Sequence, residues 1–67
     1  MFFARGINKI AQKLGEEAVE LIIEAKDEDV ELFKGEAADL LYFFMVLLAE
    51  KQIPLNDVLM TLKRRRR

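Results

Sequence analysis

The stretch Leu40-Leu41-Tyr42-Phe43-Phe44-Met45-Val46-Leu47-Leu48-Ala49 decides the fold of this 67-residue chain. It forms the second half of a helix that we expect from about Val30 to Lys51. A helix that is apolar on every side must be buried on every side. Two short neighbouring helices are too few to enclose it, so we expect a helical bundle that is completed by oligomerisation, as a dimer or a tetramer.

Helical spacing continues on both sides of this segment. Apolar residues recurring every three or four positions predict a first helix from about Ala4 to Lys26. Asp27-Glu28-Asp29 reads as a turn in which either aspartate can cap the second helix. Pro54 fits the first position of a third helix, expected to end near Arg65. With no strand pattern, the sequence predicts one all-α domain over residues 1–67, with three helices per chain.

The amino-acid composition limits the kinds of catalytic and metal-binding site that this chain can form. The chain has no cysteine and no histidine, and 52% of its residues are hydrophobic. Disulfides, thiolate metal sites and histidine-based catalysis are therefore excluded. A chain this short has difficulty stabilising itself with its own core, and oligomerisation is a common remedy.

Charge is distributed unevenly. Residues 1–62 carry six basic and twelve acidic residues, whereas the tail Lys63-Arg64-Arg65-Arg66-Arg67 is wholly basic. The acidic body argues against nucleic acid as a partner. The tail either complements the dipole of the last helix, which we favour, or binds phosphate.

No membrane partner or targeting segment is expected. The apolar run of ten residues is well below the ~20 needed to span a bilayer, and Met1-Phe2-Phe3-Ala4 is too short for a signal peptide. We therefore expect a cytoplasmic protein.

Five carboxylates form the densest group of potentially catalytic or metal-binding side chains in the sequence. They belong to Gly15-Glu16-Glu17-Ala18-Val19-Glu20 and Glu36-Ala37-Ala38-Asp39. Residues three or four apart share one face of a helix, so each group projects to one side. If the first two helices pack antiparallel, the two groups can meet across the interface.

Clustered carboxylates raise each other's pKa, and a hard divalent cation relieves that repulsion. Mg²⁺ prefers oxygen ligands and is often completed by substrate phosphates. The alternative is a solvated acidic face. Asp39 favours the metal site, because its apolar neighbours predict partial burial and buried charges are normally paired or bound to metal.

Three segments resemble the phosphoribosyl-ATP pyrophosphohydrolase family, within the all-α nucleotide pyrophosphohydrolase (MazG-like) superfamily. They are Lys13-Leu14-Gly15-Glu16-Glu17-Ala18-Val19-Glu20, Glu36-Ala37-Ala38-Asp39-Leu40-Leu41-Tyr42 and Ile53-Pro54-Leu55-Asn56-Asp57-Val58-Leu59. The superfamily pattern is E-x-x-E followed by E-x-x-D on the next helix. The resemblance implies Mg²⁺-dependent hydrolysis of phosphoribosyl-ATP to phosphoribosyl-AMP and pyrophosphate, in histidine biosynthesis.

The resemblance also implies roles for individual residues. It assigns the metal to Glu17, Glu20, Glu36 and Asp39, and it makes Glu16 and Glu17 the catalytic pair. Glu16 either binds a second metal ion or accepts the proton of water. Lys13 and Lys9 are expected to contact phosphate, although they are also ordinary partners for glutamates on the same helix. Phe43 lies four residues beyond Asp39, on the carboxylate side of its helix, and is expected beside the substrate.

Two departures from the family keep other functions open. Phe43 stands where the family usually has a histidine, and the chain begins almost at Gly6, so we expect a domain that is short at its N-terminus. The first alternative is a house-cleaning pyrophosphohydrolase of other nucleoside triphosphates. The second is an inactive helical oligomerisation module.

Overall fold

The computed structural model describes the backbone of residues 4–65 and the side chains of residues 6–65. It contains α1 (Ala4–Ala25), α2 (Val30–Glu50) and α3 (Leu55–Arg65), and no strand lies between residues 4 and 65. The predicted all-α class and the three helices are confirmed, with bounds that differ from the predicted ones by at most one residue. Arg66 and Arg67, the end of the basic tail, lie outside the described residues.

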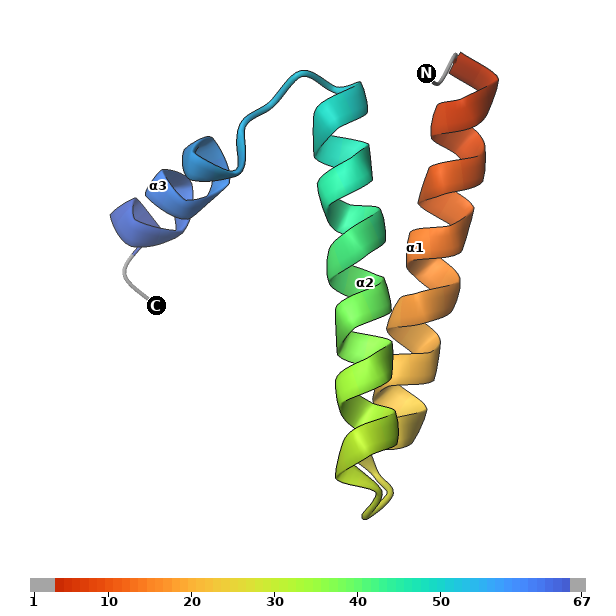
Figure 1. The fold of residues 1–67 in the computed structure, drawn as a ribbon. Coiled ribbons are helices and arrows are strands. Elements are labelled where there is room, and N and C mark those ends of the chain that lie inside the picture. The colour runs from red at the N-terminus through yellow and green to blue at the C-terminus, as the bar shows by residue number, and fades with distance from the viewer. Residues whose placement is uncertain (1–3, 66–67) are drawn as a thin grey trace.

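The first two helices form an antiparallel hairpin, and α3 projects away from it (Figure 1). The molecule measures 36 × 33 × 14 Å, so it is barely thicker than one helix, which is about 10–12 Å wide with its side chains. Its radius of gyration is 13.7 Å, whereas a compact chain of this length would have about 11 Å. Both dimensions indicate a single layer of helices whose two faces are not covered by any other described residues.

Asp29 begins α2 as its N-cap. It has an extended backbone (φ −82°, ψ 97°), and its Oδ1 accepts a hydrogen bond from the backbone N–H of Leu32 at 3.1 Å. This bond satisfies one of the N–H groups that a helix start leaves without an intrahelical partner. Of the two aspartates that the sequence offered for this position, Asp29 is the cap.

We expect Asp29→Ala to lower the free energy of unfolding by about 1 kcal/mol, because the cap is lost. Urea denaturation followed by circular dichroism measures this. Asp27→Ala is the matched control, since Asp27 is an exposed aspartate of the same turn that does not cap the helix. Equal losses in the two variants would show that the charge of the turn matters and the cap does not.

A Schellman motif ends α2 and sets the direction of the chain towards α3. The N–H of Ile53 donates to the carbonyl of Leu48 at 2.9 Å, and the N–H of Gln52 donates to that of Ala49 at 3.1 Å. Gln52 takes the left-handed conformation that this motif requires, with φ 58°. Pro54, which the sequence predicts as the first residue of the third helix, directly precedes α3, because the helix begins one residue later, at Leu55.

The last turn of α3 is basic. Lys63, Arg64 and Arg65 occupy it, where positive charge complements the helix dipole. This placement agrees with the favoured interpretation of the tail, for the part that the structure describes.

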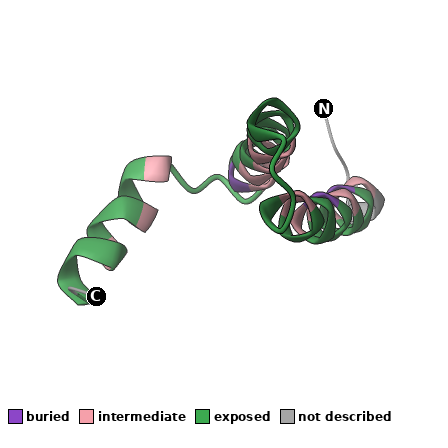
Figure 2. Cartoon of the chain, turned by 90° about the horizontal axis from the view of Figure 1, so that it is seen from below, coloured by how far each residue is buried: buried purple, intermediate pink, exposed green. Residues whose placement is uncertain are grey.

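Few apolar side chains are buried. Among residues 6–65, only Ile10 and Leu48 are buried hydrophobic residues. In the apolar half of α2, Leu41 is 57% exposed and Tyr42 is 63% exposed, and most of the surface of all three helices is exposed or half-buried (Figure 2). The single chain therefore covers only part of the segment that the sequence predicts to be enclosed. None of the helices described is both long enough and apolar enough to cross a membrane.

Candidate functional site

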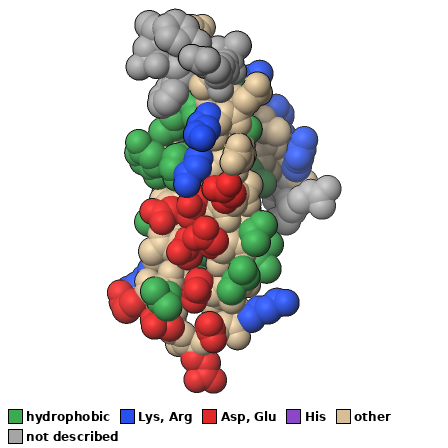
Figure 3. Space-filling view, turned by 90° about the vertical axis from the view of Figure 1, so that its right-hand side faces the viewer, with side chains coloured by type: hydrophobic (Ala, Val, Ile, Leu, Met, Phe, Trp, Pro, Cys, Tyr) green, Lys and Arg blue, Asp and Glu red, His purple; other side chains and the backbone are tan. Residues whose placement is uncertain are grey.

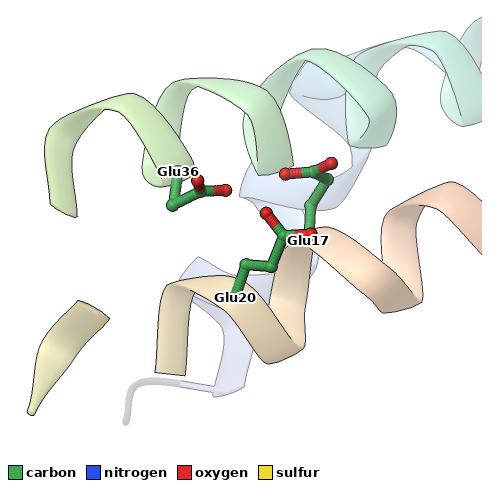
Figure 4. A group of neighbouring side chains, drawn as sticks. All are labelled: Glu17, Glu20 and Glu36. Atoms are coloured by element: carbon green, nitrogen blue, oxygen red, sulfur yellow. The ribbon is translucent and has the colours of Figure 1, made fainter. Parts of the chain in front are cut away.

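Three carboxylates meet between α1 and α2. Glu17 and Glu20 come from α1 and Glu36 comes from α2, and each offers an oxygen within 4.8 Å of the others (Figure 4). Glu17 is 7% exposed, Glu36 is half-buried and Glu20 is exposed. The group thus runs from a buried carboxylate to open solvent, which leaves one side accessible to a ligand.

The buried oxygens of this group lack hydrogen-bond partners. Within residues 6–65, Oε1 of Glu17 and Oε1 of Glu36 are both buried and receive no hydrogen bond. A buried polar atom without a partner costs free energy, and more so when it carries charge. Oxygen-only donors that are close together and unpaired fit a hard divalent cation such as Mg²⁺.

Glu24 extends this acidic face by one helical turn beyond Glu20. Its Oε1 is likewise buried without a partner in the described part of the chain. Glu24 is not among the site residues that the sequence predicts. Its spacing of four residues from Glu20 was the available indication.

The pKa of Glu36 is raised to about 7. The main cause is the Glu17 carboxyl, which shares a hydrogen bond with Glu36 when one of the two groups is protonated. Desolvation and the nearby Glu20 carboxylate raise this pKa further. At neutral pH and without a bound cation, the Glu36 carboxyl is therefore partly protonated.

This pKa predicts a pH dependence of stability. The folded state keeps the Glu36 proton up to about pH 7, whereas an unperturbed glutamate releases it near 4.5. Its contribution to the free energy of unfolding is therefore complete below pH 4.5 and is lost as the pH rises to about 7.

We expect this loss in metal-free protein, measured by urea denaturation between about pH 5 and pH 8. Glu36→Gln should remove it, because the amide does not titrate. An identical pH profile in that variant would assign the dependence to other groups.

Asp39 and Glu16 lie outside the three-carboxylate group. Asp39 is exposed, so the predicted partial burial is wrong for the single chain: its neighbours Ala38 and Leu41 are exposed as well. Glu16 accepts a hydrogen bond from Nε2 of Gln12 at 3.1 Å. This bond, followed by the charge of Lys13, lowers the pKa of Glu16 on the solvent side of α1.

Lys13 and Phe43 do come together. Nζ of Lys13 lies 5.7 Å from the centroid of the Phe43 ring, and it pairs with Oε1 of Glu16 at 3.6 Å. The pair with Glu17 that the four-residue spacing offered is not formed. Lys9 is exposed, and its charge contributes to the lowered pKa of Glu16. Basic side chains border the acidic ones on this face of the hairpin (Figure 3).

One hollow of the described chain is apolar. It has a volume of about 490 Å³ and is lined by Leu14, Ala37, Leu40, Leu41 and Phe44. None of the carboxylates lines it. The hairpin therefore presents an acidic site and, apart from it, an apolar surface.

Comparison with known proteins gives one family. The family model described as phosphoribosyl-ATP pyrophosphohydrolase matches residues 1–66. The chain is 60% identical over 63 residues to a phosphoribosyl-ATP pyrophosphatase of Rhizorhabdus wittichii, covering 94% of this chain and 59% of that protein. It is 57% identical over 63 residues to the histidine biosynthesis bifunctional protein HisIE of Bacillus subtilis, covering 94% of this chain and 30% of that protein.

A phosphoribosyl-ATP pyrophosphatase of Clostridium botulinum is 50% identical over 64 residues, which cover 96% of this chain and 58% of that protein. The chain thus spans between about three-tenths and six-tenths of the length of these relatives. No solved structure matches the chain.

Proposed function

The chain belongs to the phosphoribosyl-ATP pyrophosphohydrolase family, and on this premise we propose that it hydrolyses phosphoribosyl-ATP to phosphoribosyl-AMP and pyrophosphate in histidine biosynthesis. The observation that carries the proposal is the group of Glu17, Glu20 and Glu36, in which Oε1 of Glu17 and Oε1 of Glu36 are buried without a hydrogen-bond partner among residues 6–65. In the proposed reaction, the oxygen of water attacks the α-phosphorus, which a bridging oxygen joins to the β-phosphorus. The bond to the leaving phosphate oxygen breaks, and pyrophosphate departs.

We propose that Glu17, Glu20 and Glu36 hold Mg²⁺, with Asp39 as a fourth ligand. Asp39 is three residues beyond Glu36 on α2, so it lies on the same side of that helix. When bound, Mg²⁺ supplies positive charge to the phosphate oxygens and Lewis acidity to the reaction. The donor set supports this assignment, because every side chain in it offers carboxylate oxygen.

The protein's own groups would handle the proton and the substrate. Glu17 is the better placed of the two catalytic carboxylates to accept the proton of water, since it lies inside the group while Glu16 is bonded to Gln12. Glu16 keeps the alternative role of binding a second metal ion. Lys13 and, further out, Lys9 would contact phosphate. Such chemistry depends on positioning and electrostatics, so it needs no histidine.

We also propose that the protein works as a homo-oligomer, a dimer or a tetramer. The single layer of helices, 14 Å thick, and the exposure of Leu41 and Tyr42 support this. A second copy that covers the apolar surface would complete the bundle.

Pyrophosphate release tests the reaction. Purified protein is incubated with phosphoribosyl-ATP and, separately, with a panel of other nucleoside triphosphates, each with and without Mg²⁺. We expect Mg²⁺-dependent release from phosphoribosyl-ATP. Release only from other triphosphates would assign one of them as the substrate. The panel is included because Phe43 stands where the family usually has a histidine. Absence of release from all of them would reject the enzymatic proposal and favour a helical oligomerisation module.

A further inference from the structure

The contact between Lys13 and Phe43 joins the two helices at one end of the acidic site. Lys13 belongs to α1, four residues before Glu17, and Phe43 belongs to α2, four residues after Asp39. The 5.7 Å from Nζ to the ring centroid is within the range of a cation–π interaction, which extends to about 6 Å. The ammonium is therefore held about one helical turn from the carboxylates.

Glu16 alone would hold this ammonium loosely. The distance from Nζ of Lys13 to Oε1 of Glu16 is 3.6 Å, and the two side chains are 40% and 47% exposed. Exposed pairs of this kind contribute little, and the flexible stem of lysine leaves its ammonium free to turn. An additional contact from the other helix is what restricts it.

The ring of Phe43 is suited to provide that contact. Phe43 is half-buried, and the Tyr42 ring packs against it edge to face, with centroids 5.1 Å apart and planes at 78°. A neutral ring holds the ammonium without cancelling its charge. A second carboxylate in the same place, in addition to Glu16, would further offset the positive charge that a phosphate needs.

We propose that Phe43 is a positioning residue: its ring face holds the Lys13 ammonium beside the carboxylates, ready to bind substrate phosphate. This inference rests on the proposed function, because it assigns phosphate to that end of the site. It also explains how an aromatic residue can act in phosphate binding without touching the base of the substrate.

A double-mutant cycle tests the proposal. Phe43→Leu removes the ring, Phe43→Tyr keeps it as the matched control, and Lys13→Met removes the charge while keeping the stem. The first measurement is the Kd of pyrophosphate in the presence of Mg²⁺, a probe with neither base nor ribose. The second is the chemical shift of the ε-methylene protons of Lys13, which a ring face moves upfield.

We expect Phe43→Leu to weaken pyrophosphate binding about two- to five-fold and to abolish the upfield shift, whereas Phe43→Tyr preserves both. In the Lys13→Met background, Phe43→Leu should cause no further loss, because its effect passes through Lys13. An equal loss in that background would overturn the proposal. So would a change in the KM of phosphoribosyl-ATP with no change for pyrophosphate, which would mean that the ring contacts the nucleoside.

The two proposals fail in different ways. If the wild-type protein binds pyrophosphate with the expected coupling but hydrolyses no substrate, the positioning role stands and the proposed reaction falls. If hydrolysis is Mg²⁺-dependent but the two substitutions are additive, the reaction stands and the positioning role falls. Failure of the wild-type protein to bind pyrophosphate would reject the positioning role.

Discussion

Glu17→Gln is expected to reduce Mg²⁺-dependent pyrophosphate release by roughly 10²–10³-fold, since the metal contributes several kcal/mol and each tenfold is about 1.4 kcal/mol. The same substitution should stabilise the metal-free protein by about 1 kcal/mol. Glu17 is the most buried member of the group, and its Oε1 has no partner in the described chain. The new amide removes a like charge and donates a hydrogen bond to a neighbouring carboxylate.

Glu17→Gln is therefore expected to lower the activity and to raise the stability of the metal-free protein. Thermal denaturation in a chelator and in excess Mg²⁺ should show that wild-type protein gains stability from the metal and that Glu17→Gln does not. Glu31→Gln is the control, because the Glu31 side chain is 82% exposed and, among residues 6–65, pairs only with Lys34, at 3.1 Å. A Glu17→Gln variant that keeps both turnover and stabilisation by Mg²⁺ would remove Glu17 from the metal site.

Leu41→Lys is expected to dissociate the oligomer and to lower Tm by roughly 10 °C. Covering one leucine contributes about 1.5–3 kcal/mol, and 1 kcal/mol shifts Tm by about 4–8 °C in a domain of this size. Leu41 lines the apolar hollow and is 57% exposed in the single chain, so the described residues leave it to be covered by the proposed partner. Light scattering gives the mass, and dilution of the wild-type protein should also lower Tm.

Leu32→Lys is the matched control for this substitution. Leu32 lies on the same helix and is 53% exposed, but it does not line the hollow. A smaller effect at Leu32 would place the interface over the hollow. A wild-type protein that is a monomer at micromolar concentration, or equal effects at the two leucines, would contradict the proposed assembly.

The helices themselves follow from local rules that the sequence carries. Apolar spacing sets the extents of α1 and α2, Asp29 supplies the cap at the turn, and the basic residues after Leu62 occupy the last turn of α3. Each of these depends on contacts within four residues, which is why the predicted bounds agree with the structure. The placement of Glu17 and Glu20 on one side of α1 likewise follows from their spacing of three residues.

Contacts between the helices could not be predicted from local spacing. The sequence predicts that Glu36 and Asp39 lie on the same side of the second helix and that both bind metal. In the structure only Glu36 joins Glu17 and Glu20, while Asp39 is exposed. Lys13 pairs with Glu16 on its own helix, as helical spacing allows, whereas its contact with the Phe43 ring on α2 could not be predicted from that spacing.

The sequence by itself determined the helical class, the helix bounds and the acidic face of α1. Only the tertiary structure decided which carboxylate of α2 completes the group, which partner Lys13 takes and how little of the apolar surface one chain covers. The physical reason is that spacing fixes where side chains lie around one helix axis. The rotation and register of α1 against α2 depend on side-chain packing along their whole interface, which no short motif contains.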